Sequence, residues 1–320
     1  MRVHCLPAVF LAPFLAAAQP ASIDSPGLGV AYDSRSMALR AIRGIPGASL
    51  LGDSMDSGTP FVYAAISPRQ DLALGITPDG QVRLVRFGGA PVSQSLDAAY
   101  PSPTRIVFAP GGRAALLIGP HIQVATGLDN IPALRELSSP WLPALPAAFA
   151  LSDDGQALVL ASGTVWLISP DGNAINLPLP GTITAAAFRT NSHDIVAATP
   201  SGDVYVVRQA GLNAEVHQVY SGDDATTGPA GVQFSADGTR VFLASSSGIL
   251  STIDVGTGIA GSLSCQCKPT GLDPLRDNAI FRLNEISDRP LMLFDASSPD
   301  PRIWFVPADT TSIDQQRSAR

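Results

Sequence analysis

Side chains with catalytic potential are few in this sequence. Beyond the first eighteen residues, the histidines are His121, His193 and His217, and they are well separated. No G-x-S-x-G segment occurs, so the usual sign of a nucleophile on a strand-to-helix turn is missing. His121 begins an expected strand and His193 follows an expected turn, as is typical of surface histidines. We therefore predict no catalytic residue.

Paired acidic residues occur in two places, each with a structural explanation. Asp153-Asp154 lies in an expected turn, where aspartate side chains bond the nearby backbone. Asp223-Asp224 lies in a long loop, and the D-x-D-x-D pattern of a calcium loop is absent. Gly111-Gly112 joins two expected strands and precedes no helix, unlike a phosphate-binding loop. We predict neither a metal site nor a cofactor.

Cys265 and Cys267 are the cysteines beyond the first eighteen residues. On one regular strand their Cα atoms would lie roughly 6.6 Å apart, at the upper edge of disulfide geometry. A disulfide between them therefore needs a turn, and Pro269 favours one. We expect a local staple or two buried thiols. Half of a metal site and a redox pair are the alternatives.

Several arginines stand at near-alternate positions of expected strands. If these arginines line a central channel, they would attract anions. If they lie on outer strands, they would mainly promote solubility. We favour the second interpretation. The residues are Arg40, Arg43, Arg83, Arg86 and Arg282.

The elements that must position these side chains are clearest in segment 231–258, GVQFSADGTRVFLASSSGILSTIDVGTG. Val232 and Phe234 alternate with small or polar neighbours, as in a strand. Ser235-Ala236-Asp237-Gly238 predicts a tight turn, because serine and aspartate bond the backbone and glycine accepts a positive φ. Further strands are expected at 241–244, 249–255 and 259–264. The segment predicts one small sheet of four antiparallel strands.

The same turn recurs along the chain at intervals of 42, 43, 37, 46 and 40 residues, a spacing typical of propeller blades. A short alternating segment precedes each turn, and an apolar segment follows it. The anchor positions are Gln70, Gly112, Gly155, Ser192, Gly238 and Asn278.

The repeat resembles the bacterial YVTN-type β-propeller repeat, whose blades read SPDG, YVTN and VIDxxTG. The matching segments are SADG at 235–238, VFLAS at 241–245 and IDVGTG at 253–258, with related segments at 152–155, 165–170 and 293–295. The resemblance covers roughly residues 60–308 and implies the fold. Lactonase-like members of this group hydrolyse sugar lactones at residues of the central channel, some with a bound metal, which the resemblance implies as an alternative activity.

We predict an all-β fold, a β-propeller of seven blades of four-stranded antiparallel sheets, with six blades as the alternative. A hairpin formed by 29–33 and 37–43 is expected to lie against strand 302–306 and complete the last blade, so that the ring closes. The propeller would span 29–308 as one domain, after a linker at 19–28 and before a disordered tail at 309–320.

Two long connections are the expected contact surfaces, because loops that project from a propeller face commonly bind partners. One is segment 127–142, which contains Trp141, and the other is segment 220–229, which contains Asp223 and Asp224. Solvated loops without a partner are the alternative.

The composition indicates which partners and which compartment to expect. The net charge is −7 and Lys268 is the only lysine, so the clustered cations that nucleic acids need are missing. Residues 1–18 combine a basic start, a short apolar run and Ala16-Ala17-Ala18, which predicts a cleaved signal peptide and a secreted or periplasmic protein. No other segment is apolar enough for a membrane span.

We therefore predict an exported, monomeric β-propeller that acts as a non-catalytic binding or assembly module, with a protein or glycan partner at one face. This function rests on analogy of fold. The lactonase-like hydrolase, with or without a metal, is the alternative.

Overall fold

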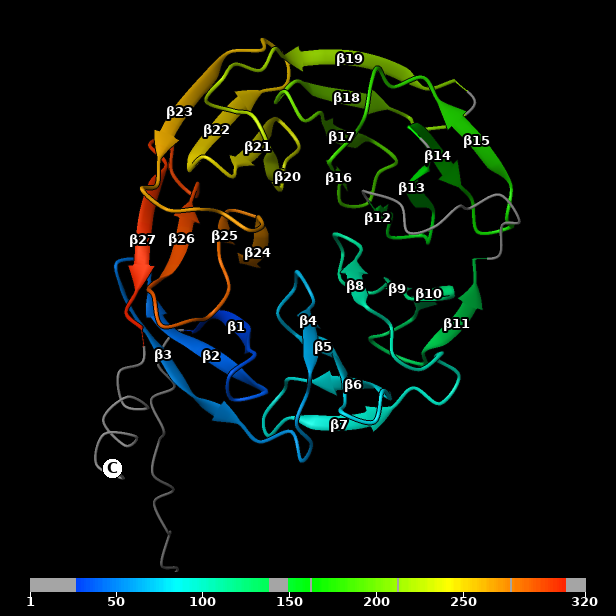
Figure 1. Ribbon diagram of the computed structural model, residues 1–320, viewed down its shortest axis with the longest axis vertical. Coiled ribbons are helices and arrows are strands. Elements are labelled where there is room, and N and C mark those ends of the chain that lie inside the picture. Colours follow the sequence, from blue (N-terminus) through cyan, green and yellow to red (C-terminus); the bar gives the residue numbers. More distant parts are fainter. Residues whose placement is uncertain (1–26, 138–148, 162, 212, 277, 309–320) are drawn as a thin grey trace, which may run out of the picture.

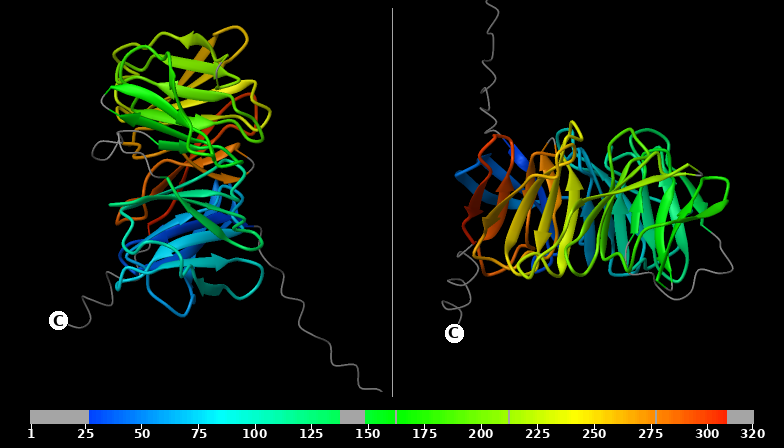
Figure 2. Two further views of the ribbon diagram at one scale, coloured as in Figure 1. Left: turned by 90° about the vertical axis from the view of Figure 1, so that its right-hand side faces the viewer. Right: turned by 90° about the horizontal axis from the view of Figure 1, so that it is seen from above.

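The structure is a computed structural model that describes residues 27–137, 149–161, 163–211, 213–276 and 278–308. The described chain forms β-strands and no helix, arranged as small antiparallel sheets in a ring around a central hollow (Figure 1). The side views show that the ring is thinner along its axis than across it (Figure 2). It contains no helix that is long and apolar enough to span a membrane. The predicted β-propeller is confirmed.

Six sheets have four strands and the first has three. The first contains β1 (Gly27–Asp33), β2 (Ala38–Ile45) and β3 (Ala48–Met55). The next three contain β4 (Tyr63–Ile66), β5 (Leu72–Ile76), β6 (Val82–Arg86) and β7 (Val92–Ser95); β8 (Arg105–Phe108), β9 (Ala115–Ile118), β10 (Ile122–Thr126) and β11 (Ala133–Glu136); and β12 (Phe149–Leu151), β13 (Ala157–Ala161), β14 (Thr164–Ile168) and β15 (Ala174–Leu177).

The last three contain β16 (Ala185–Phe188), β17 (Ile195–Ala198), β18 (Val204–Arg208) and β19 (Glu215–Tyr220); β20 (Pro229–Phe234), β21 (Arg240–Ser245), β22 (Ile249–Asp254) and β23 (Ala260–Ser264); and β24 (Asp273–Arg276), β25 (Ile280–Arg282), β26 (Leu291–Asp295) and β27 (Arg302–Val306). In each sheet the first strand is innermost (Figure 1). The six registered repeats thus form six complete blades, and the three-stranded sheet occupies a seventh place in the ring.

The turn between the first and second strands repeats as predicted. In five of the six blades the anchor residue donates its backbone N–H to the carbonyl three residues earlier, at 2.8 to 3.2 Å. Most anchors have the positive φ expected of this turn, including Gln70 at 60° and Asn278 at 46°. Ser192 is an exception, because the left-handed residue there is Asn191, with φ 51°. Asparagine tolerates that conformation better than serine, so the left-handed residue moves by one position while the hydrogen bond stays at Ser192.

The core lies between neighbouring blades. Three of the second strands are apolar on both faces and fully buried, namely β5 (LALGI), β9 (ALLI) and β17 (IVAA). A strand in the middle of a blade is covered on both sides by the adjacent blades, which explains why these segments do not alternate. Each apolar cluster therefore joins two sheets, and an isolated blade would expose both of its apolar faces.

The prediction that the N-terminal strands complete the last blade is wrong in its hydrogen bonding. Among the described strands, β27 pairs only with β26, and β1, β2 and β3 form their own sheet. The two sheets meet face to face, with Ile42 and Leu293 in one cluster against which Trp304 packs. The expected hairpin gains β3 because Gly44 and Gly47, both with positive φ, turn the chain back at 45–48.

One side chain reinforces this closure. The Gln70 amide oxygen accepts a hydrogen bond from the Val30 N–H at 2.6 Å, and its amide nitrogen donates to the Pro274 carbonyl at 3.0 Å. Gln70 therefore connects the second sheet to both the first and the last. Gly29 permits the contact, since a Cβ there would lie 2.7 Å from the Gln70 amide oxygen.

Segment 127–142 is not one long connection as predicted. Residues 133–136 form β11, which pairs with 123–126 of β10 and completes its blade. The short strand ALRE follows Pro132 and has little apolar alternation, so its sequence resembles a loop. Trp141 lies outside the described residues. The first strand begins at Gly27, two residues before the expected start of the propeller.

Candidate functional site

Strand direction alternates within each blade, so the connections fall on two opposite faces. Turns between first and second strands, such as 67–71 and 235–239, form what we call the turn face. Connections between blades, and those between second and third strands such as 283–290, form what we call the entry face.

On the turn face, the paired aspartates predicted from sequence join neighbouring blades. The Asp153 carboxylate accepts hydrogen bonds from the Gly111 N–H at 2.6 Å and the Asn191 N–H at 2.7 Å. Asp154 accepts from Ser152 and lies 2.8 Å from Nε2 of His193. Burial would raise the pKa of Asp154, but the hydrogen bonds from Ser152 and His193 lower it overall. These residues act in blade assembly.

The remaining sequence candidates lie apart from one another. His217 is exposed and lies 3.6 Å from Glu215 on the outer strand β19. Asp223 folds its own loop, because its carboxylate accepts from the N–H groups of Ala225 and Thr226, both at 3.0 Å. Asp224 is exposed. The role of this aspartate pair in a contact surface stays a prediction.

The arginines have different environments. Arg40 is buried and lies 3.3 Å from Asp33, while Arg83 and Arg86 bond Ser93 and Gln94 on the neighbouring strand. Arg43 is exposed on β2. Arg282 lines the central cavity. Four of the five therefore lie outside the channel, but the buried Arg40 does not have the solubilising role that we favoured.

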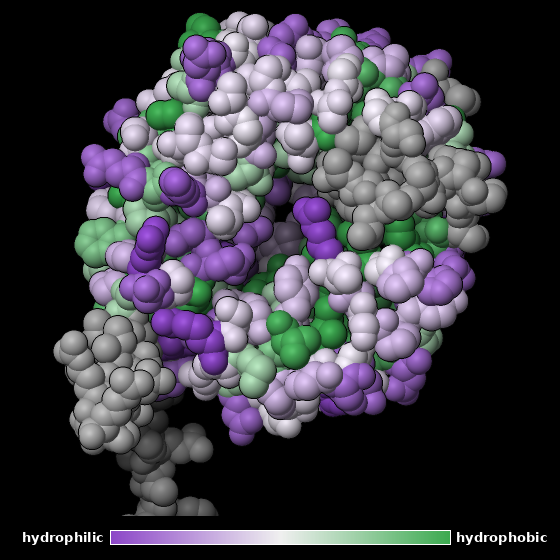
Figure 3. Space-filling view, viewed as in Figure 1, coloured by the Kyte–Doolittle hydropathy of each residue, from purple (hydrophilic) through white to green (hydrophobic). Residues whose placement is uncertain are grey.

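The central cavity of the described structure has a volume of about 710 Å³. This volume lies within the range of small-molecule sites. The polarity of its wall differs from one side to the other. The strands β12, β16 and β20 contribute small apolar residues such as Ala150, Ala186 and Gly231. Hydrophilic side chains gather beside the hollow over the blade of β24–β27 (Figure 3). The cavity thus has one polar side and one apolar side.

Arg282 forms the centre of the polar side. Its guanidinium bonds the Asp273 carboxylate at 2.7 Å and the Glu285 carboxylate at 2.8 Å. The Arg282 side chain is 11% exposed, whereas those of Asp273 and Glu285 are 54% and 62% exposed. Burial would lower the pKa of Arg282, but the two carboxylate charges hold it above its ordinary value. The arginine therefore fixes two carboxylates at the cavity wall.

Tyr63 and Arg105 lie on the inner strands β4 and β8 and line the same cavity. Burial raises the pKa of Tyr63, a hydrogen bond from the Ile106 backbone opposes this, and the charges of Asp273 and Glu285 raise it further. Arg105 is exposed and forms no ion pair with any described residue. The polar side thus offers carboxylate acceptors and one unpaired cation.

The two carboxylates have room for further hydrogen bonds. No other described residue donates a hydrogen bond to the Asp273 or Glu285 side chain, so both carboxylates can accept donors from a ligand. The described residues that line the cavity include no histidine or cysteine to act as base or nucleophile. Nowhere in the described chain do three or more His, Cys, Asp or Glu side chains gather as a metal site.

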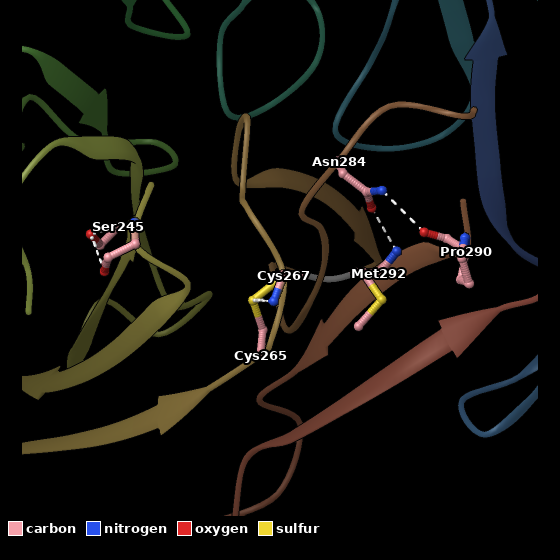
Figure 4. The surroundings of a disulfide bond; sticks show 7 residues. Ser245, Cys265, Cys267, Asn284, Pro290 and Met292 are labelled. Carbon is pink, nitrogen blue, oxygen red and sulfur yellow. Dashed lines mark hydrogen bonds between the residues drawn. A yellow bond between two sulfur atoms is a disulfide. The ribbon is translucent and has the colours of Figure 1, made fainter. Parts of the chain in front are cut away.

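Cys265 and Cys267 are joined by a disulfide on the connection from β23 to β24 (Figure 4). Their Cα atoms are 5.1 Å apart, closer than on a regular strand, because Gln266 between them adopts φ 51°. The turn that sequence geometry required is therefore present. Asn284 and Met292 lie nearby, and the Met292 N–H donates to the Asn284 side chain at 2.6 Å. The disulfide staples a connection on the entry face.

Sequence reasoning missed four cavity residues, Tyr63, Arg105, Asp273 and Glu285. Tyr63, Arg105 and Asp273 are each the first residue of an innermost strand, and Glu285 follows β25. The sequence signal that could have found them is a polar residue at the first position of the innermost strand of a blade. This signal is weak, because the first residue of a strand lies next to a turn, where polar residues are common in any fold.

No protein-family model matches this sequence, and no curated protein matches it either. Among solved structures, the chain is similar to a protein of unknown function from Desulfotomaculum acetoxidans, at 14% identity and a TM-score of 0.58, covering 88% of this chain and 99% of the other. It is also similar to PorZ of Porphyromonas gingivalis, a bacterial surface component of the type-IX secretion system. That match has 15% identity and a TM-score of 0.56, covering 85% of this chain and 36% of PorZ. Such low identities show the fold alone.

Proposed function

We propose that this protein is an exported β-propeller that binds a protein or glycan partner at its entry face and catalyses no reaction itself. The observation that carries this proposal is the pair of carboxylates, Asp273 and Glu285, held by Arg282 at the wall of the 710 Å³ cavity. Fixed acceptors can bind hydroxyl, ammonium or guanidinium groups without ordering the side chains first.

Two further observations support export and assembly. A disulfide persists in oxidising compartments, which agrees with the signal peptide expected at residues 1–18. PorZ, similar to this chain over part of its length, is a surface component of a secretion system, so this fold occurs in an envelope assembly. We propose a secreted or periplasmic location, which the N-terminal sequence of protein isolated from each cell fraction would test. Protein that retains residues 1–18 in the cytoplasm would refute it.

The binding function is tested by retrieving partners from the envelope fraction and by a glycan array, using the tagged protein and two doubly substituted variants. Asp273→Asn with Glu285→Gln removes the cavity carboxylates. Asp300→Asn with Glu215→Gln removes the same charge from exposed sites outside the cavity. We expect a stoichiometric protein or a glycan bound by the wild type and the second variant, and reduced at least tenfold by the first.

Two results would overturn the proposal. One is equal retention of the ligand by both variants, or no ligand with the wild type. The other is turnover of sugar lactones by the purified protein, with or without divalent metal, since that would favour the lactonase-like hydrolase. The channel residues described above give no support to that alternative.

A further inference from the structure

A second pocket lies on the entry face and shares no residue with the central cavity. Its volume is about 290 Å³, and it lies between the connection from β7 to β8 and the turn from β9 to β10. The wall is mainly apolar and rich in proline, and it includes Tyr100, Pro101, Pro103, Leu117, Pro120 and His121. A pocket of this size accepts one or two side chains of a larger partner.

Two aromatic rings and one carboxylate form its rim. The rings of Tyr100 and His121 lie 4.5 Å apart, centroid to centroid, with an angle of 30° between their planes. Glu136 holds both, since its carboxylate accepts from the Tyr100 hydroxyl at 3.0 Å and lies 3.2 Å from Nδ1 of His121. A carboxylate only accepts, so Nδ1 of His121 carries the proton in this contact.

The polar groups inside the pocket are already occupied. Gln123, which is 5% exposed, accepts from the Tyr100 N–H at 2.7 Å through its amide oxygen. Its amide nitrogen donates to the Ala98 carbonyl at 3.1 Å. Gln123 therefore fixes the loop that carries Tyr100, and its amide oxygen and its amide nitrogen each already have a partner. An apolar guest fits this interior, whereas a saccharide would leave its hydroxyl groups without partners.

The rim favours a positive charge. Tyr100, His121 and Glu136 are 40%, 54% and 41% exposed, so a ligand can reach them. The charged group at the rim is the Glu136 carboxylate, which is an acceptor. Arg135 precedes Glu136 on β11, where alternation directs its side chain to the opposite face of the sheet. A cationic group beside an apolar one therefore complements the pocket.

We propose that this pocket binds a proline-rich peptide segment that carries an arginine. Aromatic rings lining an apolar groove are a recurring way to bind polyproline II segments, whose preformed geometry reduces the entropy lost on binding. A proline ring would lie against Tyr100 and the wall prolines. The arginine would bond Glu136, which presents a planar carboxylate to its guanidinium. This inference does not depend on the proposed role of the central cavity.

The test is fluorescence polarisation with a labelled proline-rich peptide that carries one central arginine, and with the same peptide carrying glutamine instead. We expect saturable binding of the arginine peptide to the wild-type protein. Tyr100→Ala should weaken it about tenfold or more, as for a central aromatic contact. Glu136→Gln should weaken the arginine peptide up to about fivefold and leave the glutamine peptide nearly unchanged, as expected for an exposed ion pair.

Phe305→Ala is the matched control, because Phe305 is an aromatic residue on β27 that is 60% exposed and does not line the pocket. It should leave the affinity within about twofold of the wild type, since exposed residues outside a contact contribute little. Thermal melting of each variant checks folding, and Glu136→Gln tests the pocket if Tyr100→Ala is unstable. The proposal is overturned if the wild type does not bind the arginine peptide, if Phe305→Ala weakens it equally, or if both peptides respond alike to Glu136→Gln.

Discussion

Replacing Arg282 with methionine should destabilise the protein by removing the group that holds two carboxylates together. Arg282 bonds Asp273 at 2.7 Å and Glu285 at 2.8 Å from an environment where it is 11% exposed. Methionine fills much of the same space with a flexible apolar chain, so the change mainly deletes the charged hydrogen bonds and leaves the two acids facing each other.

The structure sets the size of this effect. A hydrogen bond to a charged group contributes about 1.5–3 kcal/mol where water is excluded, and an exposed ion pair contributes about 0.2–1 kcal/mol. Asp273 and Glu285 are each more than half exposed, so the lower range applies to most of each bond. We therefore expect a loss of about 1–2 kcal/mol in the free energy of unfolding, or roughly 2–6 °C in Tm for a chain of this size.

The assay is urea unfolding at neutral pH with a thermal scan, and Arg83→Met serves as the control. Arg83 also sits on a strand and bonds Ser93 at 2.7 Å, but it has no carboxylate partner among the described residues. The difference between the two variants should shrink as salt is added, because exposed charges are screened. If Arg282→Met is as stable as Arg83→Met, the carboxylates are not held by Arg282 and the reasoning on the central cavity fails.

Three further predictions concern stability. Gly75→Ala should lower the free energy of unfolding in urea by about 1–3 kcal/mol, because a Cβ at Gly75 would lie 2.4 Å from the ring of Phe61. Gly261→Ala is the control and should change this free energy little, because a Cβ at Gly261 would meet no atom within 4 Å. The hydrogen-bonded Asp237 has its pKa lowered from 3.8 to about 2, so it stabilises the fold above pH 3.8 and the effect fades as pH falls toward 2. Asp237→Asn should therefore lower the free energy of unfolding by about 1 kcal/mol at pH 6, after allowance for solvent screening, and by almost nothing at pH 2. Urea unfolding of the variant and the wild type at both pH values measures this difference. Cys265→Ser opens a disulfide between residues two apart, and the entropy of so short a loop predicts a loss of about 1.6 kcal/mol at most; a larger loss in thermal unfolding would show that the disulfide does more than restrict the unfolded chain.

The repeat was predictable from sequence because the turn and the strand after it are set by local chemistry. Serine and aspartate before a glycine specify the turn at Gly238, and the apolar run of β21 specifies a strand covered on both sides. Even Gln70, a poor match to the pattern, keeps the turn hydrogen bond and the left-handed backbone. Such signals involve residues a few positions apart and so survive in degenerate copies.

The closure of the ring and the cavity site were not predictable in the same way. Whether β3 pairs with β2 or the hairpin pairs with β27 depends on residues more than two hundred positions apart, and either arrangement satisfies the local pattern. Likewise, Arg282 meets Asp273 and Glu285 only because β24, β25 and the loop after them converge on the cavity. In sequence, Arg282 resembled the other strand arginines, which bond neighbouring strands instead.

The way Gln70 joins three sheets has a mechanical consequence. In the described chain no backbone ladder crosses from β27 to β3, so parting the ring at that seam breaks side-chain packing and the hydrogen bond from Gln70 to Pro274, while every sheet and the hydrogen bond from Val30 to Gln70 stay intact. The seam is therefore where the circle opens first under force or heat. A circular permutant would join the first sheet to the last by a covalent link and place the new chain ends between two other sheets. It would test whether this seam opens first because the chain is interrupted there.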